Sequence, residues 1–214
     1  GVGGQNRGNA GGCGYLVTHG GVAGMCLLGE RTEGKVVLGH FGALWLRIRV
    51  QGNFIHTAFS EGTRDANSIL RMHTLIDAVK EWIPTWEGDP ANSYRGAKAI
   101  VNVGAIEGGF GWRVSRTPHH TDLFLDVRVP PTKEMGVARR AVLDWVRSLG
   151  ARYPAWGIEG EVYVTAPGPE IAAGHHPLPA LRRLPHAGLR PTPERAAPRQ
   201  LRAPSPPPPA GSPP

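Results

Sequence analysis

The sequence predicts an α+β fold, in which a four-stranded antiparallel sheet is covered on one face by two helices in the order β-α-β-β-α-β of ferredoxin-like domains. Two observations lead to this prediction. Three of the four predicted strands alternate two sets of residues along the chain, which is typical of half-buried strands, and two longer segments repeat apolar residues at spacings of three and four, which is typical of amphipathic helices. These segments occupy residues 40–166, and about 125 residues are enough for an independent core.

The first strand and the first helix of this order lie between Gly42 and Leu70. The strand alternates Leu44, Leu46, Ile48 and Val50 with Trp45, Arg47, Arg49 and Gln51. Gly52 and Asn53 end the strand, and Asp65 is the predicted N-cap of the helix. The helix presents its apolar residues on one face, namely Ile69, Met72, Leu75, Ile76, Val79, Trp82 and Ile83.

The other strands and the second helix follow in order. Lys98–Ile106 is the second strand, Glu107–Gly111 a glycine-rich turn, and Asp122–Val129 the third strand, which Pro130–Pro131 end. Thr132 is the predicted cap of the second helix, Gly150 its end, and Ile158–Val164 the fourth strand. The open face of the sheet should carry charges of both signs, as a solvated face does: Arg47, Arg49, Asp126, Arg128, Glu159 and Glu161.

Two segments flank this unit. Gly1–Gly14 is predicted to be a flexible or close-packed loop rather than a phosphate-binding loop, because no strand precedes it and no Gly-Lys-Ser/Thr follows it. A short helix at Tyr15–Gly20 and short strands at Met25–Leu28 and Val36–Leu38 complete residues 1–39. Residues 167–214 hold 15 of the 21 prolines and show neither the helical nor the strand period of apolar residues, so we expect this tail to be disordered. The alternative is that its PxxP-like runs bind an SH3-type domain.

Composition argues against several classes of protein. The net charge of +7 comes mostly from residues 171–214, which hold six of the 24 basic residues and one of the 17 acidic ones, so it does not indicate a nucleic-acid-binding face. The two cysteines form no disulfide framework or zinc signature and fit a reducing cytoplasm. No apolar run approaches the roughly 18 residues that span a bilayer, and no signal-peptide pattern occurs. We therefore expect a cytoplasmic protein without membrane or nucleic-acid partners.

Glu30 and His56 could each carry chemistry because of their positions. Glu30 follows a predicted strand beside a glycine, where a carboxylate can face a cleft and bind a metal ion; the alternative is a solvated loop residue. His56 lies in a loop between two phenylalanines and is either catalytic or a packed or surface residue. The adjacent pairs His119–His120 and His175–His176 are poor chelates, because neighbours on a strand point to opposite faces.

Arg113 and Arg116 follow the glycine-rich turn between the second and third strands. Two guanidinium groups beside such a turn could bind a carboxylate through paired hydrogen bonds. The alternative is a solvated hairpin.

Four motifs occur in a fixed order along roughly residues 1–175: L-L-G-E-R-T, G-H-F-G-A-L-W-L-R-I-R-V-Q-G-N-F-I-H-T-A-F, N-V-G-A-I-E-G-G and L-F-L-D-V-R-V-P-P. They resemble the M20 metallopeptidases, which include acetylornithine deacetylases, succinyl-diaminopimelate desuccinylases, aminoacylases and carboxypeptidases. The resemblance implies a two-metal catalytic domain with an inserted lid, or dimerisation, domain of the topology described above. Residues 1–39 then resemble part of the α/β catalytic domain and residues 40–166 the lid, with residues 167–214 as a disordered tail.

The resemblance also implies roles for individual residues. Glu30 matches a zinc ligand, and His56 matches a lid histidine that reaches the active site of the partner subunit and helps hold the substrate carbonyl and its oxyanion. Asn67 resembles an asparagine that begins the lid helix and is a substrate contact in some members. Arg113 and Arg116 lie in an altered form of a substrate-binding turn. The other metal ligands and the general-base glutamate of the family have no match in this chain.

Three functions therefore compete. The first is a fragment of a homodimeric hydrolase with two zinc ions per active site (cobalt and manganese are alternatives), which cleaves amide bonds of N-acyl amino acids or short peptides. Because a tight zinc site needs three or more protein ligands, we expect this chain alone to bind no stoichiometric zinc and to be inactive. The second is a self-associating interaction module without catalytic activity. The third, a ferredoxin-like RNA-binding protein, is disfavoured because the sheet is expected to lack paired surface aromatics.

Overall fold

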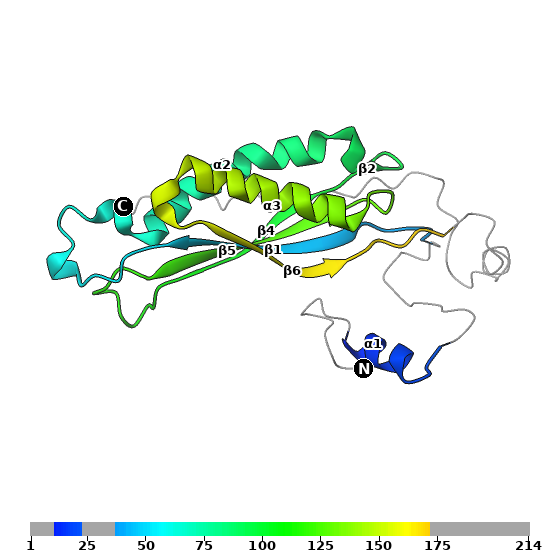
Figure 1. Ribbon diagram of the computed structural model, residues 1–214, viewed down its shortest axis with the longest axis horizontal. Helices are drawn as coiled ribbons and strands as arrows, with labels where there is room; N and C mark the ends of the chain where they lie inside the picture. The colour runs from blue at the N-terminus through cyan, green and yellow to red at the C-terminus, as the bar shows by residue number, and fades with distance from the viewer. Residues whose placement is uncertain (1–10, 23–36, 172–214) are drawn as a thin grey trace, which may run out of the picture. The chain divides into compact units, whose positions relative to one another are not determined.

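The computed structural model describes residues 11–22 and 37–171 (Figure 1). The predicted strand Met25–Leu28, the metal-ligand candidate Glu30 and almost all of the predicted tail lie outside these residues. In the first described segment, α1 (Gly11–Thr18) begins four residues before the predicted helix, and the chain turns at Gly20, whose φ is +86°. Among the described helices, none is both long and apolar enough to cross a membrane.

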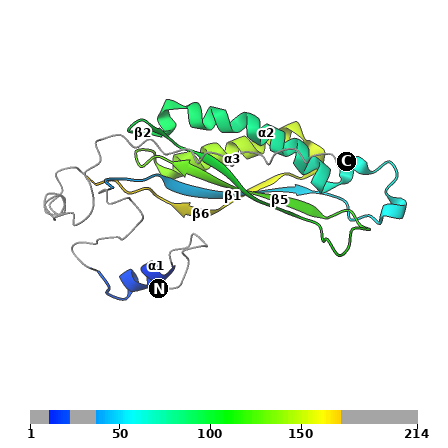
Figure 2. The same ribbon diagram turned by 180° about the vertical axis from the view of Figure 1, so that it is seen from behind.

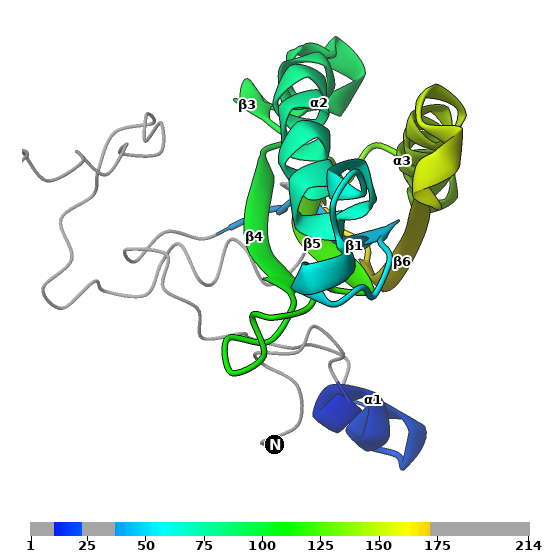
Figure 3. The ribbon, with the colours of Figure 1, turned by 90° about the vertical axis from the view of Figure 1, so that its left-hand side faces the viewer.

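Residues 37–171 form the predicted α+β unit. The four strands β1 (Gly42–Gln51), β4 (Val101–Gly108), β5 (His120–Val129) and β6 (Glu159–Ala166) make one sheet in the order β4-β5-β1-β6, with every pair antiparallel. The helices α2 (Ser68–Gly88) and α3 (Met135–Arg152) both cover the same face of the sheet (Figure 3). The predicted fold class is therefore confirmed.

The second predicted strand is split in the structure. Ala97–Lys98 forms β3, which pairs with β2 (Ser93–Tyr94) in a separate two-stranded ribbon, and β4 begins only at Val101. The ribbon turns at Arg95 and Gly96, which both have positive φ. Lys98 pairs with Ser93 in the ribbon and is therefore outside the sheet strand. At its other end the sheet strand continues two residues beyond the prediction, to Gly108, because Glu107 and Gly108 pair with Asp122 and Thr121.

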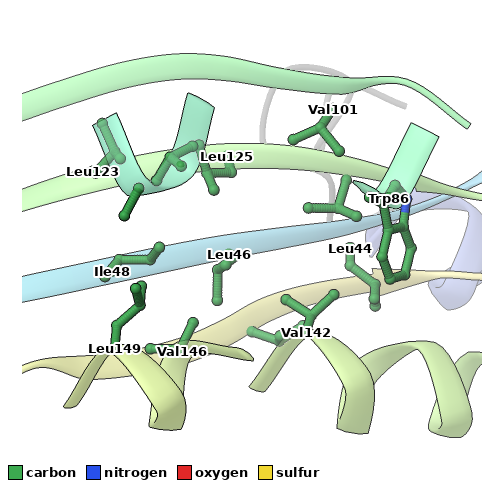
Figure 4. Close-up of a cluster of buried hydrophobic side chains, with 14 of the residues drawn as sticks. Leu44, Leu46, Ile48, Trp86, Val101, Leu123, Leu125, Val142, Val146 and Leu149 are labelled. Atoms are coloured by element: carbon green, nitrogen blue, oxygen red, sulfur yellow. The ribbon is translucent and has the colours of Figure 1, made fainter. Parts of the chain in front are cut away.

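The hydrophobic core lies between the sheet and the two helices (Figure 4). The inward residues of β1 alternate as predicted, and Leu44, Leu46, Ile48 and Val50 are all fully buried. On β5 the same side carries Leu123, Leu125, Val127 and Val129. The helices contribute Met72, Leu75, Val79 and Trp86 from α2 and Ala138, Val142, Val146 and Leu149 from α3.

The start of α2 corrects the prediction that Asp65 caps the helix. Asn67 is the N-cap, and its side-chain Oδ1 accepts a hydrogen bond of 2.9 Å from the backbone N–H of Ile69. Asp65 lies instead in a short 3₁₀ turn, Arg64–Ala66, whose last carbonyl accepts a hydrogen bond from the backbone N–H of Asn53. This tertiary contact keeps the turn outside the helix, so the second of two possible capping residues is used.

Both ends of α3 also differ from the prediction. Glu134, not Thr132, is the N-cap, and its side chain makes no capping hydrogen bond. The helix continues past Gly150 to Arg152, because Gly150 does not adopt the positive φ of a glycine stop and the backbone N–H of Tyr153 still donates to the carbonyl of Leu149.

The open face of the sheet carries the predicted mixture of charges, joined in ion pairs. Arg49 binds Asp122 with two hydrogen bonds of 2.7 Å, and Arg47 and Arg128 pair with Glu161 and Asp126. Three aromatic side chains share this face: the ring centroid of Tyr163 lies 6.0 Å from that of Trp45 and 6.1 Å from that of Phe124. The expectation that this face lacks grouped aromatics is therefore wrong, because the pairing of β1 with β5 on one side and β6 on the other brings Trp45, Phe124 and Tyr163 close together.

The ion pair of Arg49 with Asp122 gives a pH-dependent prediction. The hydrogen bonds from Arg49 hold the pKa of Asp122 below its usual value, so the pair stabilises the fold above the carboxyl pKa of the unfolded chain and is lost as the pH falls through the lower, folded pKa. Because the Asp122 side chain is only 8% exposed, we expect Asp122→Asn to lower the free energy of unfolding at pH 7 by about 2 kcal/mol. Urea denaturation from pH 7 to pH 2 measures this, and the difference from the wild type should shrink below about pH 4.

The exposed pair of Asp77 with Lys80 on α2 provides the matched control. Asp77→Asn should leave the denaturation midpoint unchanged at every pH, since an exposed ion pair contributes little. Equal effects of the two substitutions would show that burial of the Asp122 pair is unimportant.

The chain enters and leaves the sheet through two neighbouring segments. Gly39 and Glu170 form an antiparallel bridge, and the backbone N–H groups of His40 and Ile171 donate to the carbonyls of Pro169 and Leu38. The hydroxyl of Tyr94 donates a hydrogen bond of 2.7 Å to the carboxylate of Glu170. The predicted strand Val36–Leu38 is therefore wrong in its described part, because residues 37 and 38 lie outside any strand and pairing begins at Gly39.

Candidate functional site

Two loops that follow neighbouring strands meet at one end of the sheet. The first, residues 52–67, connects β1 to α2, and the second, residues 109–119, connects β4 to β5; both project beyond the same end of the sheet in Figures 1 and 2. An antiparallel bridge joins His56 to Arg116, and the backbone N–H of Thr57 donates to the carbonyl of Ser115 at 2.9 Å. The loops are therefore tied together at the predicted catalytic histidine.

The side chain of Thr117 strengthens the connection between the loops. Its Oγ1 accepts a hydrogen bond of 2.9 Å from the backbone N–H of Ile55 and donates to the carbonyl of Asn53. The backbone N–H of Thr117 donates to the carbonyl of Ile55 at 3.0 Å. Backbone groups on both sides of His56 are thus fixed by the opposite loop, so the histidine is held on a well-defined backbone.

His56 is half-buried, and its ring orientation is fixed by its own loop. The backbone N–H of Ala58 donates to His56 Nδ1 at 3.2 Å. A ring nitrogen that accepts a hydrogen bond carries no proton, so the neutral imidazole has its proton on Nε2. His56 therefore presents an N–H donor, the group needed to bind a carbonyl oxygen or an oxyanion.

Arg113 and Arg116 gather around the ring of Phe54. Their guanidinium carbons lie 5.8 Å and 5.0 Å from the ring centroid, and the imidazole of His119 stacks on the same ring at 4.4 Å. Within the described residues, neither arginine has a carboxylate within 4 Å, unlike the arginines of the sheet face. Their guanidinium groups are therefore available to hydrogen-bond an anionic group such as a carboxylate.

The predicted site residues are only partly brought together. His56, Asn67, Arg113 and Arg116 all belong to the two loops at one end of the sheet. Asn67 uses its Oδ1 to cap α2 and keeps its amide N–H groups for other partners. Glu30 lies outside the described residues. Sequence reasoning did not assign a role to Phe54 or His119, since their stacking depends on the register that places Gln51 opposite His120, and no local pattern signals it.

A metal centre is not formed by the described part of the chain. No three His, Cys, Asp or Glu side chains gather there in a way that could hold an ion. A tight zinc site needs about three protein ligands, so the described residues do not fit one, and the chemistry of this part of the chain is that of hydrogen-bond donors and guanidinium groups.

The comparison with protein families decides the identity of this unit. The family model for the M20 peptidase dimerisation domain matches residues 38–154. The chain belongs to the M20 peptidase family. The M20 match covers both helices and every strand of the sheet except β6, so the unit with the two loops is the M20 dimerisation domain.

Similar sequences include proteins that are described as probable carboxypeptidases. A "Probable carboxypeptidase" of Uncinocarpus reesii is 36% identical over 89 residues, which is 41% of this chain and 20% of that protein. A second one, from Aspergillus terreus, is 26% identical over 139 residues, which is 64% of this chain and 32% of that protein. The chain thus spans a third or less of the length of these relatives.

Similar solved structures include two hydrolases. A hydantoinase/carbamoylase family amidase from Burkholderia ambifaria has a TM-score of 0.47 and 13% identity, covering 63% of this chain and 30% of that one. Human carnosine dipeptidase 1 has a TM-score of 0.45 and 10% identity, covering 63% of this chain and 38% of that one. At this level of similarity the two structures bear on neither substrate nor mechanism.

Proposed function

We propose that this dimerisation domain acts as the lid of an amide-cleaving hydrolase, and that His56 binds the substrate carbonyl in the active site of a partner subunit. The observation that carries the proposal is the Nε2–H donor of His56, held by the Ala58 hydrogen bond on a loop that the second loop fixes. Such a donor stabilises the negative charge that develops on the carbonyl oxygen in the transition state. N-acyl amino acids and short peptides are the substrates that we propose.

The arginines and Asn67 complete the proposed substrate contacts. Arg113 and Arg116 would bind the carboxylate that every N-acyl amino acid and peptide carries, and they lie on the loop bridged to His56. Asn67 would contribute an amide N–H.

The proposed metal ions, two zinc ions with cobalt or manganese as alternatives, would supply the activated water, with Glu30 as one ligand. Because further ligands have no match in this chain, we propose that the chain alone binds no stoichiometric zinc and is inactive.

A graft tests this function. The segment Gly39–Glu170 replaces the corresponding segment of the Uncinocarpus reesii relative and is fused to that protein at its two adjacent ends. Hydrolysis of N-acyl amino acids and dipeptides by this graft is then measured with added zinc. We expect the graft to cleave at least one of these classes and the chain alone to cleave none. A folded, dimeric graft that cleaves nothing would contradict the proposal.

Self-association is the second proposed activity, and the free edge of β4 favours it. Val103 and Ile106 are 43% and 53% exposed although they face the helix side of the sheet, opposite Leu125 and Leu123. At the end of β4, α2 exposes Ile69, which lies near Gly109. The opposite edge strand, β6, instead carries Glu159 and Glu161, and charges on an edge strand oppose pairing. We propose that two copies pair through β4 and α2 as a homodimer.

Sedimentation equilibrium of the full chain tests the β4 interface. Ile106→Lys should raise the dimer dissociation constant at least about tenfold, because the two-fold axis brings the new charges of both copies together. Thr165→Lys places the same charge on β6 and should change nothing. A wild-type chain that is monomeric at tens of micromolar, or equal effects of both lysines, would refute the interface.

A further inference from the structure

The loop between β4 and β5 exposes large apolar side chains beside the two arginines. Trp112 and Val114 are 78% and 82% exposed, and Phe59 on the facing loop is 78% exposed. These are the three most exposed large hydrophobic side chains in the described residues. Phe110 is 61% exposed, and its ring centroid lies 5.4 Å from that of Trp112. Apolar surface that is grouped in this way marks a contact site.

The aromatic and cationic side chains form one continuous surface. The guanidinium carbon of Arg113 lies 5.9 Å from the ring centroid of Trp112 and 5.8 Å from the ring centroid of Phe54. The guanidinium carbon of Arg116 lies 5.0 Å from the same Phe54 centroid. Arg113 therefore lies between an exposed indole and the ring that both arginines share. A ligand whose carboxylate reaches the guanidinium groups would bring any attached group within reach of Trp112.

We propose that this surface, which we call the aryl-carboxylate surface and define by Phe110, Trp112, Arg113 and Arg116, binds carboxylates that carry a large apolar or aromatic group. The guanidinium groups bind the carboxylate, and the rings of Trp112 and Phe110 pack on the apolar group. The description of this ligand as a substrate rests on the proposed function. The surface then determines specificity: amino acids with large apolar side chains are preferred over alanine or glycine.

The recognition can be tested by binding to the full chain, without hydrolysis. The probes are N-acetyl-L-phenylalanine, N-acetyl-L-alanine, which lacks the ring, and N-acetyl-L-phenylalaninamide, which lacks the carboxylate. Dissociation constants come from shifts of the backbone amide NMR signals in EDTA-containing buffer. We expect N-acetyl-L-phenylalanine to bind about three- to tenfold more tightly than N-acetyl-L-alanine, the range of one favourable aromatic contact. It should also bind more tightly than the amide, which has no carboxylate to pair with the guanidinium groups. A peptide with a C-terminal phenylalanine is the fourth probe. Its dissociation constant, compared with that of N-acetyl-L-phenylalanine, shows whether the surface prefers the end of a peptide or an N-acyl amino acid.

Two substitutions separate the contributions of the ring and the carboxylate. Trp112→Ala should remove the preference for phenylalanine over alanine and keep the preference for acid over amide. Arg113→Ala combined with Arg116→Ala should do the reverse. Tyr15→Ala, which removes another exposed aromatic ring, should change neither preference. Unchanged thermal melting shows that the variants fold.

The results separate this inference from the proposed function. Equal affinity of the wild-type chain for the three probes, or signal shifts unaffected by Trp112→Ala, would overturn the inference even if the graft hydrolyses amides. The expected preferences together with an inactive graft would uphold the surface as a binding site and reject the catalytic role of the lid.

Discussion

His56→Ala lowers kcat of the active graft by about 10²–10³, the usual effect of removing one donor to a developing oxyanion. The substitution removes the Nε2–H that the Ala58 hydrogen bond leaves as a donor, and it removes no core side chain, because His56 is only half-buried. The effect should be on kcat more than on KM, since the donor binds most strongly to the charge of the transition state. Steady-state kinetics with the best N-acyl amino acid measure both constants.

His73→Ala is the matched control for this experiment. His73 is an exposed histidine on α2, away from the two loops, so its loss should leave both constants unchanged. A His56→Ala graft with wild-type kcat would reject the oxyanion role, and a variant with a lowered melting temperature would show instead that the histidine maintains the loop structure.

Leu46→Ala should cost about 3–5 kcal/mol of the free energy of unfolding, the largest stability effect that we predict. Leu46 is fully buried in β1, opposite Leu125 on one side and Val162 on the other, and its side chain points toward Val142 and Val146 of α3 in Figure 4. Both neighbouring strands are fixed by backbone pairing, so the structure has little freedom to close the cavity. Urea denaturation, with an unchanged m-value, measures the loss.

Leu70→Ala provides the same change of side chain at a position that is 53% exposed on α2. It should cost less than about 1 kcal/mol, because most of this side chain already contacts water. A similar loss for Leu46 and Leu70 would mean that the core is not the one described here.

The regular elements could be predicted because their signals are local and repeated. The alternation along β1 involves eight successive side chains, Leu44–Gln51, and burial follows it without exception. Helix ends depend on single residues and on what those residues touch. Asp65 and Asn67 are equally good caps by type, and only the hydrogen bond from Asn53 to Ala66, made across the loop, decides between them.

The individual residues of the candidate site could be predicted from the sequence, but their proximity in the folded chain could not. His56, Arg113 and Arg116 were recognised from their positions in loops, yet about 60 residues separate the histidine from the arginines. Their proximity depends on the pairing of β1 with β5 and on the bridge between the loops, and neither is encoded in a local pattern. The grouping of Tyr163 with Trp45 and Phe124 has a similar origin, since it depends on the register between three strands that are far apart in the sequence.

Because Gly39 pairs with Glu170, the intervening residues begin and end at nearly the same point in space. A unit with adjoining ends can enter the surface loop of another protein at the cost of little strain, since the host chain needs no rearrangement to span it. Gain, loss or exchange of the whole unit then becomes a single event in evolution. The same geometry has a kinetic consequence: the closing contact joins residues far apart in sequence, so we expect it to be among the last to form as the unit folds.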